Sequence, residues 1–397
     1  MKRDQAPDQT PRLSDLVHKP TNRRVFLARA SALGVALPGL GAALAACSKT
    51  APSGEGAAEH APAAGATTGT ATGTPAQPAE QPQPHLPPNP DSRLDTALKH
   101  GTHPSSATPA STIGAADVPF HRYDPALPPL TPGAVKHIHM TAREVPVRIR
   151  PETVVAAWTF DGDIPGPIVH VRQGDTVEFT LTNQGTLPHS MDFHAAQIDP
   201  KVAFRSVPPG QSVSYTFRPK YAGAFLYHCG TSPVLMHLGS GMFGAIIVDP
   251  LTPLAPAKEF VLVQSEFYLS EAKGGIAAFD YSRMLSSEPD LTAFNGRPSQ
   301  YSDAPIHVKR GDRVRFYVVV AGPTQSCGFH VVGEQFETVY LGAPPGSAIH
   351  GVQTFSVTAG GGMIFELVAD VPGEFVFVNH SFGHGQKGAM GTLVVEA

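Results

Sequence analysis

Residues 227–243 read YHCGTSPVLMHLGSGMF, and this loop is the most informative stretch of the chain. In it, Cys229 is followed eight residues later by His237 and five residues further on by Met242. Thiolate, imidazole and thioether groups are ligands for copper, and two histidines with one cysteine and a weak axial methionine are typical of electron-transferring copper sites. The loop therefore predicts such a site, which needs one more histidine.

The additional histidine is expected from residues 187–194, LPHSMDFH, where His189 and His194 are both available. The alternative interpretation is that these are ordinary core or loop residues, because a lone cysteine is usually a small buried hydrophobe and a lone histidine a satisfied polar group. Four matching ligand types at this spacing favour a metal site.

Length, charge and cysteine content limit the class of protein. With 397 residues the chain exceeds one typical hydrophobic core, which predicts two folded domains with extensions. The net charge is −4 and the sequence has no basic stripe, so nucleic acid is not expected as a partner. If Cys47 is modified and Cys229 binds metal, Cys327 is left without a disulfide partner.

Residues 1–47 have the features of an export signal. Arg23 and Arg24 begin a twin-arginine pattern, and residues 30–46 carry no charge. The segment ends in LAAC, which is similar to the lipobox of bacterial lipoproteins, so Cys47 is expected to be acylated and to anchor the protein to a membrane. An ordinary signal peptide or a retained anchor is the alternative. The expected location is the periplasm or the cell surface.

The rest of the chain divides into a linker and two folded segments. Residues 48–122 are expected to be a disordered tether, because residues 48–119 contain no aromatic side chain and are dominated by Ala, Pro, Gly, Thr and Gln. Residues 123–252 and 253–397 show short alternating strands separated by Pro-Gly and Gly-Asp turns. This pattern predicts an all-β fold of two tandem Greek-key β-sandwich domains.

An internal repeat supports the division into two domains. Three motifs recur 134 to 150 residues apart: FDG at 160–162 and FNG at 294–296, HVRQGD at 170–175 and HVKRGD at 307–312, GAF at 223–225 and GEF at 373–375. Repetition of this kind indicates two homologous units.

The two copies are chemically unequal. The repeat places Asn379 opposite Cys229 and Ala389 opposite Met242. The second domain therefore lacks the thiolate and the thioether of the predicted copper site. It keeps His330 and a histidine-containing segment at residues 378–384, which suggests that it contributes to a site shared with another domain.

These motifs resemble those of the copper-containing nitrite reductases, two-cupredoxin members of the multicopper oxidase superfamily. The resemblance covers about residues 134–397, and it rests on PHSMDFHAA at 188–196, YHC at 227–229, MH at 236–237, GM at 241–242 and VNH at 378–380.

The resemblance implies two copper ions per subunit in a homotrimer. Type 1 copper would be held by His189, Cys229, His237 and Met242. Type 2 copper would be held by His194 and His228 of one subunit and His380 of the next. His380 is favoured over His384 because it directly follows the Val-Asn pair.

The same resemblance implies one-electron reduction of nitrite to nitric oxide. Asp192 and His330 match the residues that the family uses to deliver protons, and Val332 matches an apolar residue of the nitrite pocket. The electron donor would be a cytochrome c or a small cupredoxin. The residues themselves agree, because three imidazoles leave an open position for a small anion and the adjacent pair His228-Cys229 joins the two metals covalently.

Two departures from the family pattern leave the ligands intact but affect the surroundings of the pocket. Residues 197–201, QIDPK, replace a glycine-rich turn, and residues 331–336, VVGEQF, which include Glu334 and Gln335, lack the second histidine that some members carry. A laccase-like copper oxidase is one alternative, yet the chain has a single His-x-His pair, at residues 137–139. A non-enzymatic blue-copper electron carrier is the other, and it differs in binding one copper per chain.

Overall fold

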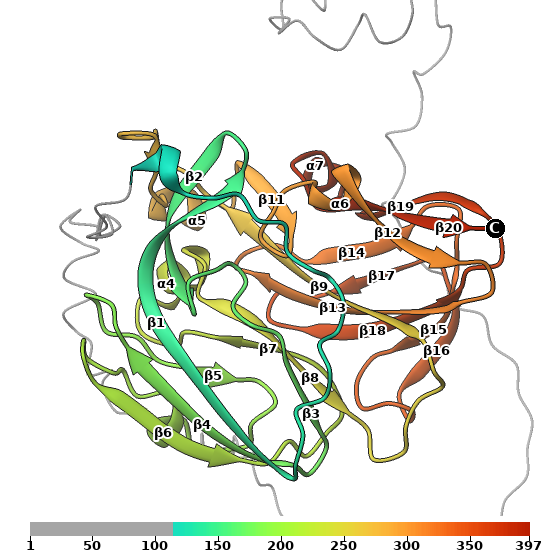
Figure 1. Ribbon diagram of the computed structural model, residues 1–397, viewed down its shortest axis with the longest axis horizontal. Coiled ribbons are helices and arrows are strands. Elements are labelled where there is room, and N and C mark those ends of the chain that lie inside the picture. Colours follow the sequence, from blue (N-terminus) through green and yellow to red (C-terminus); the bar gives the residue numbers. More distant parts are fainter. Residues whose placement is uncertain (1–113) are drawn as a thin grey trace, which may run out of the picture. The chain divides into compact units, whose positions relative to one another are not determined.

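The structure is a computed structural model that describes residues 114–397 (Figure 1). The predicted export signal, the acylation of Cys47 and most of the predicted tether lie outside the described residues. The described residues 114–122 fall within the segment predicted as tether. They contact the folded chain, because Arg148 donates hydrogen bonds to the carbonyl oxygens of Ala115 and Val118.

The first sandwich consists of a five-stranded sheet with the order β10-β2-β1-β4-β6 and a four-stranded sheet with the order β3-β8-β7-β5. These strands are β1 Val135–Arg150, β2 Thr153–Phe160, β3 Val169–Arg172, β4 Thr176–Asn183, β5 Asp192–Phe193, β6 Ser212–Phe217, β7 Gly223–His228, β8 Phe243–Asp249 and β10 Ile276–Ala277.

The second sandwich consists of a six-stranded sheet with the order β11-β9-β13-β18-β15-β16 and a five-stranded sheet with the order β12-β20-β19-β14-β17. These strands are β9 Lys258–Phe267, β11 Leu291–Phe294, β12 Ala304–Lys309, β13 Arg313–Gly322, β14 Cys327–Val331, β15 Phe336–Tyr340, β16 Ala348–Val352, β17 Thr354–Val357, β18 Gly362–Val368, β19 Gly373–Asn379 and β20 Met390–Glu396. The predicted all-β fold of two tandem sandwiches is confirmed.

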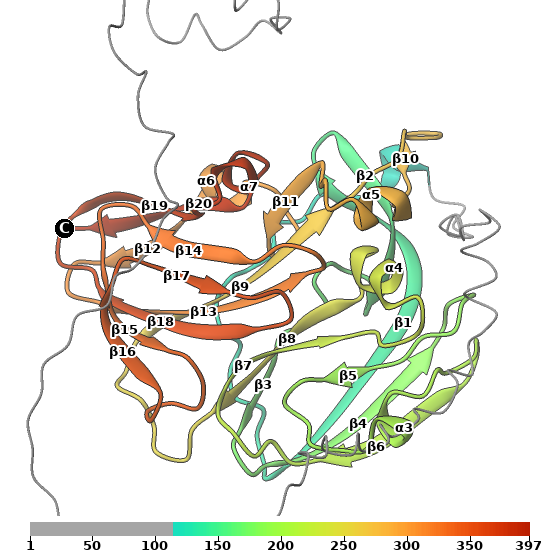
Figure 2. The ribbon, with the colours of Figure 1, turned by 180° about the vertical axis from the view of Figure 1, so that it is seen from behind.

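The helices of the described residues are short. They are the 3-10 helix η3 Ala115–Asp117 and the α-helices α3 Pro200–Ala203, α4 Val234–Gly239, α5 Tyr281–Leu285, α6 Gln300–Asp303 and α7 Phe382–Gln386. Within residues 114–397, no helix has the length and apolar character needed to span a bilayer. Figure 2 shows α4 at the ends of β7 and β8, the strands that it connects.

Alternation of side chains explains why these segments form a sandwich. In β6 exposed and buried residues alternate strictly, as expected for a strand with one face on the core. Strands β9 and β13 are instead buried on both faces. Val261 and Val319 face the core of the first sandwich, whereas Leu262 and Val318 face that of the second. The six-stranded sheet is therefore shared by both hydrophobic cores.

The repeated motifs fold in the same way in both sandwiches. Asp161 and Asn295 both adopt left-handed backbone conformations, with φ of 57° and 52°, and a glycine with positive φ follows each. The side-chain oxygen of Asp161 accepts a hydrogen bond from the Thr141 amide at 2.7 Å, and that of Asn295 accepts one from the Val263 amide at 2.7 Å. Asp and Asn tolerate this conformation and bond to nearby backbone, which explains the motif.

The segment before β1 joins the two sandwiches. Two backbone hydrogen bonds connect this segment to the second sandwich. The Leu127 amide donates to the Glu259 carbonyl, and the Val261 amide donates to the Pro125 carbonyl. The Tyr123 hydroxyl donates to the Gly166 carbonyl of the first at 3.0 Å. Figure 1 shows this teal segment crossing in front of the strands. It therefore ties the start of the described chain to both cores.

Candidate functional site

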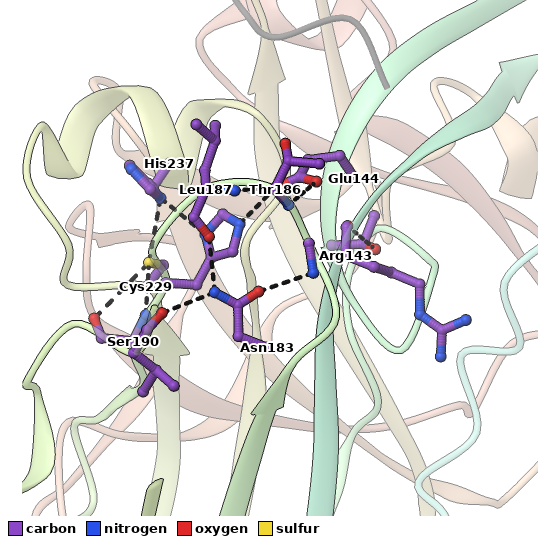
Figure 3. A network of polar contacts seen from close by, with 12 residues as sticks. Arg143, Glu144, Asn183, Thr186, Leu187, Ser190, Cys229 and His237 are labelled. Atoms are coloured by element: carbon purple, nitrogen blue, oxygen red, sulfur yellow. Dashed lines mark hydrogen bonds and ion pairs between the residues drawn. The ribbon is translucent and has the colours of Figure 1, made fainter. Parts of the chain in front are cut away.

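The first candidate site is a buried cluster of His189, Cys229 and His237. Their ligand atoms lie within 4.8 Å of one another. The Nδ1 atoms of the two histidines are 3.2 Å apart, and His237 Nδ1 is 3.4 Å from the Cys229 sulfur. His189 and Cys229 are fully buried, and Figure 3 shows the convergence of His237 and Ser190 on the sulfur.

Three separate segments position this cluster. His189 lies just before β5, Cys229 directly follows β7, and His237 is in α4. The return of the chain from α4 to β8 passes through Gly241, whose φ is 117° and where a Cβ atom would lie 2.6 Å from Ile164 Cδ1. Glycine is required there by both conformation and space.

Met242 completes the set of predicted ligands in this region. It is fully buried, and its amide donates to the His237 carbonyl at 3.2 Å. The Cys229 amide donates to the Met242 carbonyl at 3.0 Å. Backbone hydrogen bonds thus place Met242 next to Cys229 and His237, in the loop between β7 and β8.

The electrostatics of the cluster favour a thiolate. Burial raises the pKa of Cys229, but hydrogen bonds and charges from His189 and His237 more than offset burial and leave the pKa well below its usual value. The amide of Ser190 also donates to the sulfur at 3.3 Å. A buried thiolate next to two imidazole nitrogens that face each other is a donor set suited to a soft cation.

Asp192, His194 and His228 form a second cluster. The Nε2 atoms of the two histidines are 3.1 Å apart, and Asp192 Oδ2 lies 3.8 Å from His228 Nε2. Burial raises the pKa of Asp192 above its usual value, although the charges of His228 and His194 lower it. Burial and the charge of His228 lower the pKa of His194.

Hydrogen bonds fix the tautomers of these two histidines. His194 Nδ1 lies 3.0 Å from the Gly360 carbonyl oxygen, and His228 Nδ1 lies 2.8 Å from the Cys229 carbonyl oxygen. A carbonyl only accepts, so both Nδ1 atoms carry protons and both Nε2 atoms present lone pairs. Two lone pairs at this separation are stabilised by a cation, so the second cluster also fits a metal.

Residues 141–253 match the protein-family model described as multicopper oxidase. Over 248 residues the chain is 40% identical to the copper-containing nitrite reductase of Neisseria meningitidis, covering 60% of this chain and 64% of that protein. Its identity to the protein of the same name from Neisseria gonorrhoeae is also 40%, covering 60% of this chain and 63% of that protein. The chain thus spans slightly less than two thirds of the length of these relatives.

A solved structure gives the fuller match. The copper nitrite reductase from Nitrosomonas europaea aligns with a TM-score of 0.62 and 35% identity, covering 66% of this chain and 94% of that chain. The chain belongs to the copper-containing nitrite reductases. As a member of this family it has the predicted cupredoxin-like fold in both sandwiches.

Three predicted site residues of this nitrite reductase family member lie on the second sandwich. The rings of His330 and His380 are 5.3 Å apart between centroids, and His330 Nδ1 lies 2.6 Å from the Gln353 carbonyl oxygen. Val332 is 49% exposed. Among the described residues, His380 belongs to neither cluster of converging ligands.

Cys327 and His384, which were not predicted as ligands, stand at positions equivalent to the first cluster. Cys327 is fully buried at the start of β14, and burial raises the pKa of its thiol. The Ala389 amide donates to the His384 carbonyl at 3.1 Å, as the Met242 amide does to His237. Among the described residues, these two side chains join no group of three converging ligands.

Two segments that depart from the family pattern adopt compact local structure. In residues 197–201, Asp199 caps α3 by accepting a hydrogen bond from the Lys201 amide at 3.0 Å. Glu334 follows Gly333, which has φ of 86°, in the turn between β14 and β15.

Two residues next to the first cluster were missed by sequence reasoning. Glu144 Oε1 lies 3.0 Å from His189 Nε2, and the Trp158 ring packs edge-on against His237 with centroids 4.8 Å apart. In the sequence, these two residues stand out only as a carboxylate and as the single tryptophan, both within segments that form strands.

Proposed function

We propose that this protein reduces nitrite to nitric oxide and water, consuming one electron and two protons. The observation that carries the proposal is the adjacency of His228 and Cys229, because this single peptide link joins the two histidine clusters. Successive residues at the end of a strand point to opposite sides, so one short segment serves both clusters. Family membership and the names of the relatives support nitrite as the substrate.

The donor sets support two copper ions per subunit. His189, Cys229, His237 and Met242 would hold type 1 copper, since thiolate, imidazole and thioether donors suit that metal. His194 and His228, with His380 of the partner subunit, would hold type 2 copper. Copper supplies one-electron redox chemistry at these positions.

A homotrimer is proposed because His380 lies outside both clusters of its own chain. An exposed face supports this assembly: the His380 ring packs against Phe382, which is 62% exposed. A neighbouring copy that covers this face would bring His380 to His194 and His228. Val332, which is also exposed, would then line the nitrite pocket.

Asp192 and His330 are proposed to hold and deliver the two protons. Asp192 belongs to the second cluster, and its carboxylate oxygen Oδ2 lies 3.8 Å from His228 Nε2. His330 donates a hydrogen bond from Nδ1 to the Gln353 carbonyl, so its Nε2 atom is the nitrogen that would face the substrate. Acid groups positioned in this way lower the barrier of a reaction that consumes protons.

The proposed cellular setting follows from the sequence alone. A twin-arginine export signal and acylated Cys47 would place the enzyme in the periplasm or at the cell surface, anchored to a membrane. A cytochrome c or a small cupredoxin would deliver the electrons.

The decisive experiment is anaerobic turnover of the copper-loaded protein with a reduced donor and nitrite. Nitric oxide is followed directly, and copper content and electron paramagnetic resonance spectra are recorded on the same sample. We expect about one nitric oxide per electron and spectra of both copper types. Two coppers with reduction of oxygen instead of nitrite would indicate a laccase-like oxidase, and one copper with reversible reduction alone would indicate an electron carrier.

A further inference from the structure

We propose that Glu144 is a positioning residue of the first cluster, which orients His189 and favours the oxidised form of the metal bound there. The inference rests on the proposed type 1 copper at His189, Cys229, His237 and Met242.

Glu144 makes three hydrogen bonds, all to the segment that carries His189. Its carboxylate accepts from the Thr186 amide at 2.7 Å, from the Leu187 amide at 3.2 Å and from His189 Nε2 at 3.0 Å. The side chain of Glu144 is only 4% exposed. Figure 3 shows the carboxylate next to the backbone of Thr186 and Leu187. The carboxylate therefore holds both the loop and the ligand.

The loop is shaped to receive this carboxylate. A Cβ atom at Gly185 would lie 2.6 Å from Glu144 Oε1, so any larger residue would push the carboxylate away. Asn183 fixes the same loop from its other side, since its amide group donates to the Leu187 carbonyl at 2.7 Å and its oxygen accepts from the Gly185 amide at 2.9 Å.

The hydrogen bond to Glu144 determines which nitrogen of His189 is free. A carboxylate accepts the Nε2 proton, so Nδ1 presents its lone pair toward Cys229 and His237. A carboxylate in this position also makes the imidazole a stronger donor. Since its negative charge is nearly buried, it stabilises Cu(II) more than Cu(I).

The two histidines of the cluster are supported differently by one pair of neighbouring strands. Glu144 on β1 lies directly opposite Trp158 on β2. Glu144 contacts His189, whereas the Trp158 ring packs edge-on against both histidines, with centroids 4.8 Å from His237 and 6.0 Å from His189. The ring of Trp158 thus packs against both histidines, whereas the charge of Glu144 acts on His189.

The test is a redox titration of the full-length, copper-loaded Glu144→Gln variant against a one-electron mediator, followed by the type 1 visible absorption. Loss of the charge is expected to shift the equilibrium about tenfold or more toward the reduced form, which corresponds to about 59 mV. Glu178→Gln is the matched control, because Glu178 Oε2 also lies 3.0 Å from a histidine, His137 Nδ1, but on the exposed surface. The control is expected to stay within about twofold of the wild type.

An equal, small shift in both variants, with the type 1 absorption retained, would overturn the role of Glu144 and leave the proposed function standing. Absence of type 1 absorption in the wild-type protein would instead overturn the proposed copper site itself. If Glu144→Gln does not retain copper, Glu144→Asp keeps the charge but withdraws it from His189. A wild-type potential and spectrum in Glu144→Asp would contradict the proposal, whereas a shifted potential or an altered spectrum supports it.

Discussion

The two sandwiches close their inner loops with the same backbone hydrogen bond around different side chains. The Cys229 amide donates to the Met242 carbonyl at 3.0 Å, and the Asn379 amide donates to the Ala389 carbonyl at 3.0 Å. Where the Ser190 amide donates to the Cys229 sulfur, the Gly328 amide donates to Asn379 Oδ1 at 3.1 Å. The difference shows that the loop can be stabilised either by donors for a metal or by a fully bonded amide.

The pairing register of the strands allows the residues of the second cluster to be compared with their counterparts in the second sandwich. Asp192 lies opposite His228 in the first sandwich, and His330 lies opposite Val378 in the second. Asp192 and His330, the two proposed proton donors, thus occupy equivalent positions. His228, a proposed metal ligand, is replaced by Val378 in the second copy, whereas the position of the proposed proton donor keeps an ionisable side chain.

The largest expected effect comes from replacing Cys229 with asparagine, the residue found at the equivalent position, Asn379, of the second sandwich. Cys229→Asn is expected to remove type 1 copper and its visible absorption, because an amide cannot replace the thiolate. Donor-driven nitrite reduction should fall by more than about 100-fold. Copper analysis and turnover with the reduced donor measure both changes.

Asn379→Ala is the matched control for that variant. It loses buried hydrogen bonds to Gly328 and Gln264, which should lower the free energy of unfolding by about 1–3 kcal/mol. Both coppers should remain. A similar copper deficit in the two variants would show that the loops do not differ in the proposed way.

The next prediction tests whether the second sandwich serves another subunit. His194→Ala and His380→Ala should each abolish nitrite reduction by removing type 2 copper. Co-expression of the two variants in equal amounts should restore about a quarter of the wild-type sites, because an intact site needs one chain of each kind, in a fixed order, at an interface. Activity is measured after co-expression. Inactive mixtures that contain verified mixed trimers would place His380 outside the shared site.

Much of this comparison could be predicted from sequence because it depends on residue type and spacing. The His-Cys-Met loop and the repeat offsets identify the fold, and they identify Asn379 as the counterpart of Cys229. His237 and His189 are brought together in space as expected, although they are 48 residues apart.

Other features depend on the register between strands and have no local sequence signal. Glu144 reaches His189 across 45 residues only because β1 passes beside the loop. The equivalence of His384 and His237 follows from backbone hydrogen bonds after α7 and α4, where loop lengths differ and the sequence offset changes. The helix α3 was likewise not expected, because its four residues carry no helical periodicity.

Asp192→Asn, which should leave both coppers in place, tests the position where both sandwiches have an ionisable side chain. Asparagine preserves the shape of the side chain but cannot release a proton, so turnover should fall by about 100-fold or more with both coppers retained. Asp199→Asn is the control, since asparagine can still cap α3, and it should change turnover by less than about twofold. Loss of type 2 copper in Asp192→Asn would contradict the role in proton delivery.

The smallest expected effect is on stability. It concerns a histidine–acid pair that occurs once in each sandwich. His170 is buried and its Nε2 lies 3.0 Å from Asp249 Oδ1, whereas the equivalent pair His307 and Glu396 is more than half exposed. Burial lowers the pKa of His170, but the hydrogen bond and charge of Asp249 more than offset burial, so the pKa is raised above its usual value.

Because the raised pKa belongs to the folded state, the stabilising contribution of His170 is complete below its unfolded pKa and is lost as pH rises through the folded value. His170→Gln should therefore lower the free energy of unfolding by about 1–2 kcal/mol near pH 6, and by less as pH increases. Urea unfolding at several pH values measures this difference. His307→Gln should change stability by less than about 0.5 kcal/mol at every pH, because an exposed pair is screened by solvent. If the two variants had the same pH dependence, burial would not be what distinguishes the pair in the first sandwich from its counterpart in the second.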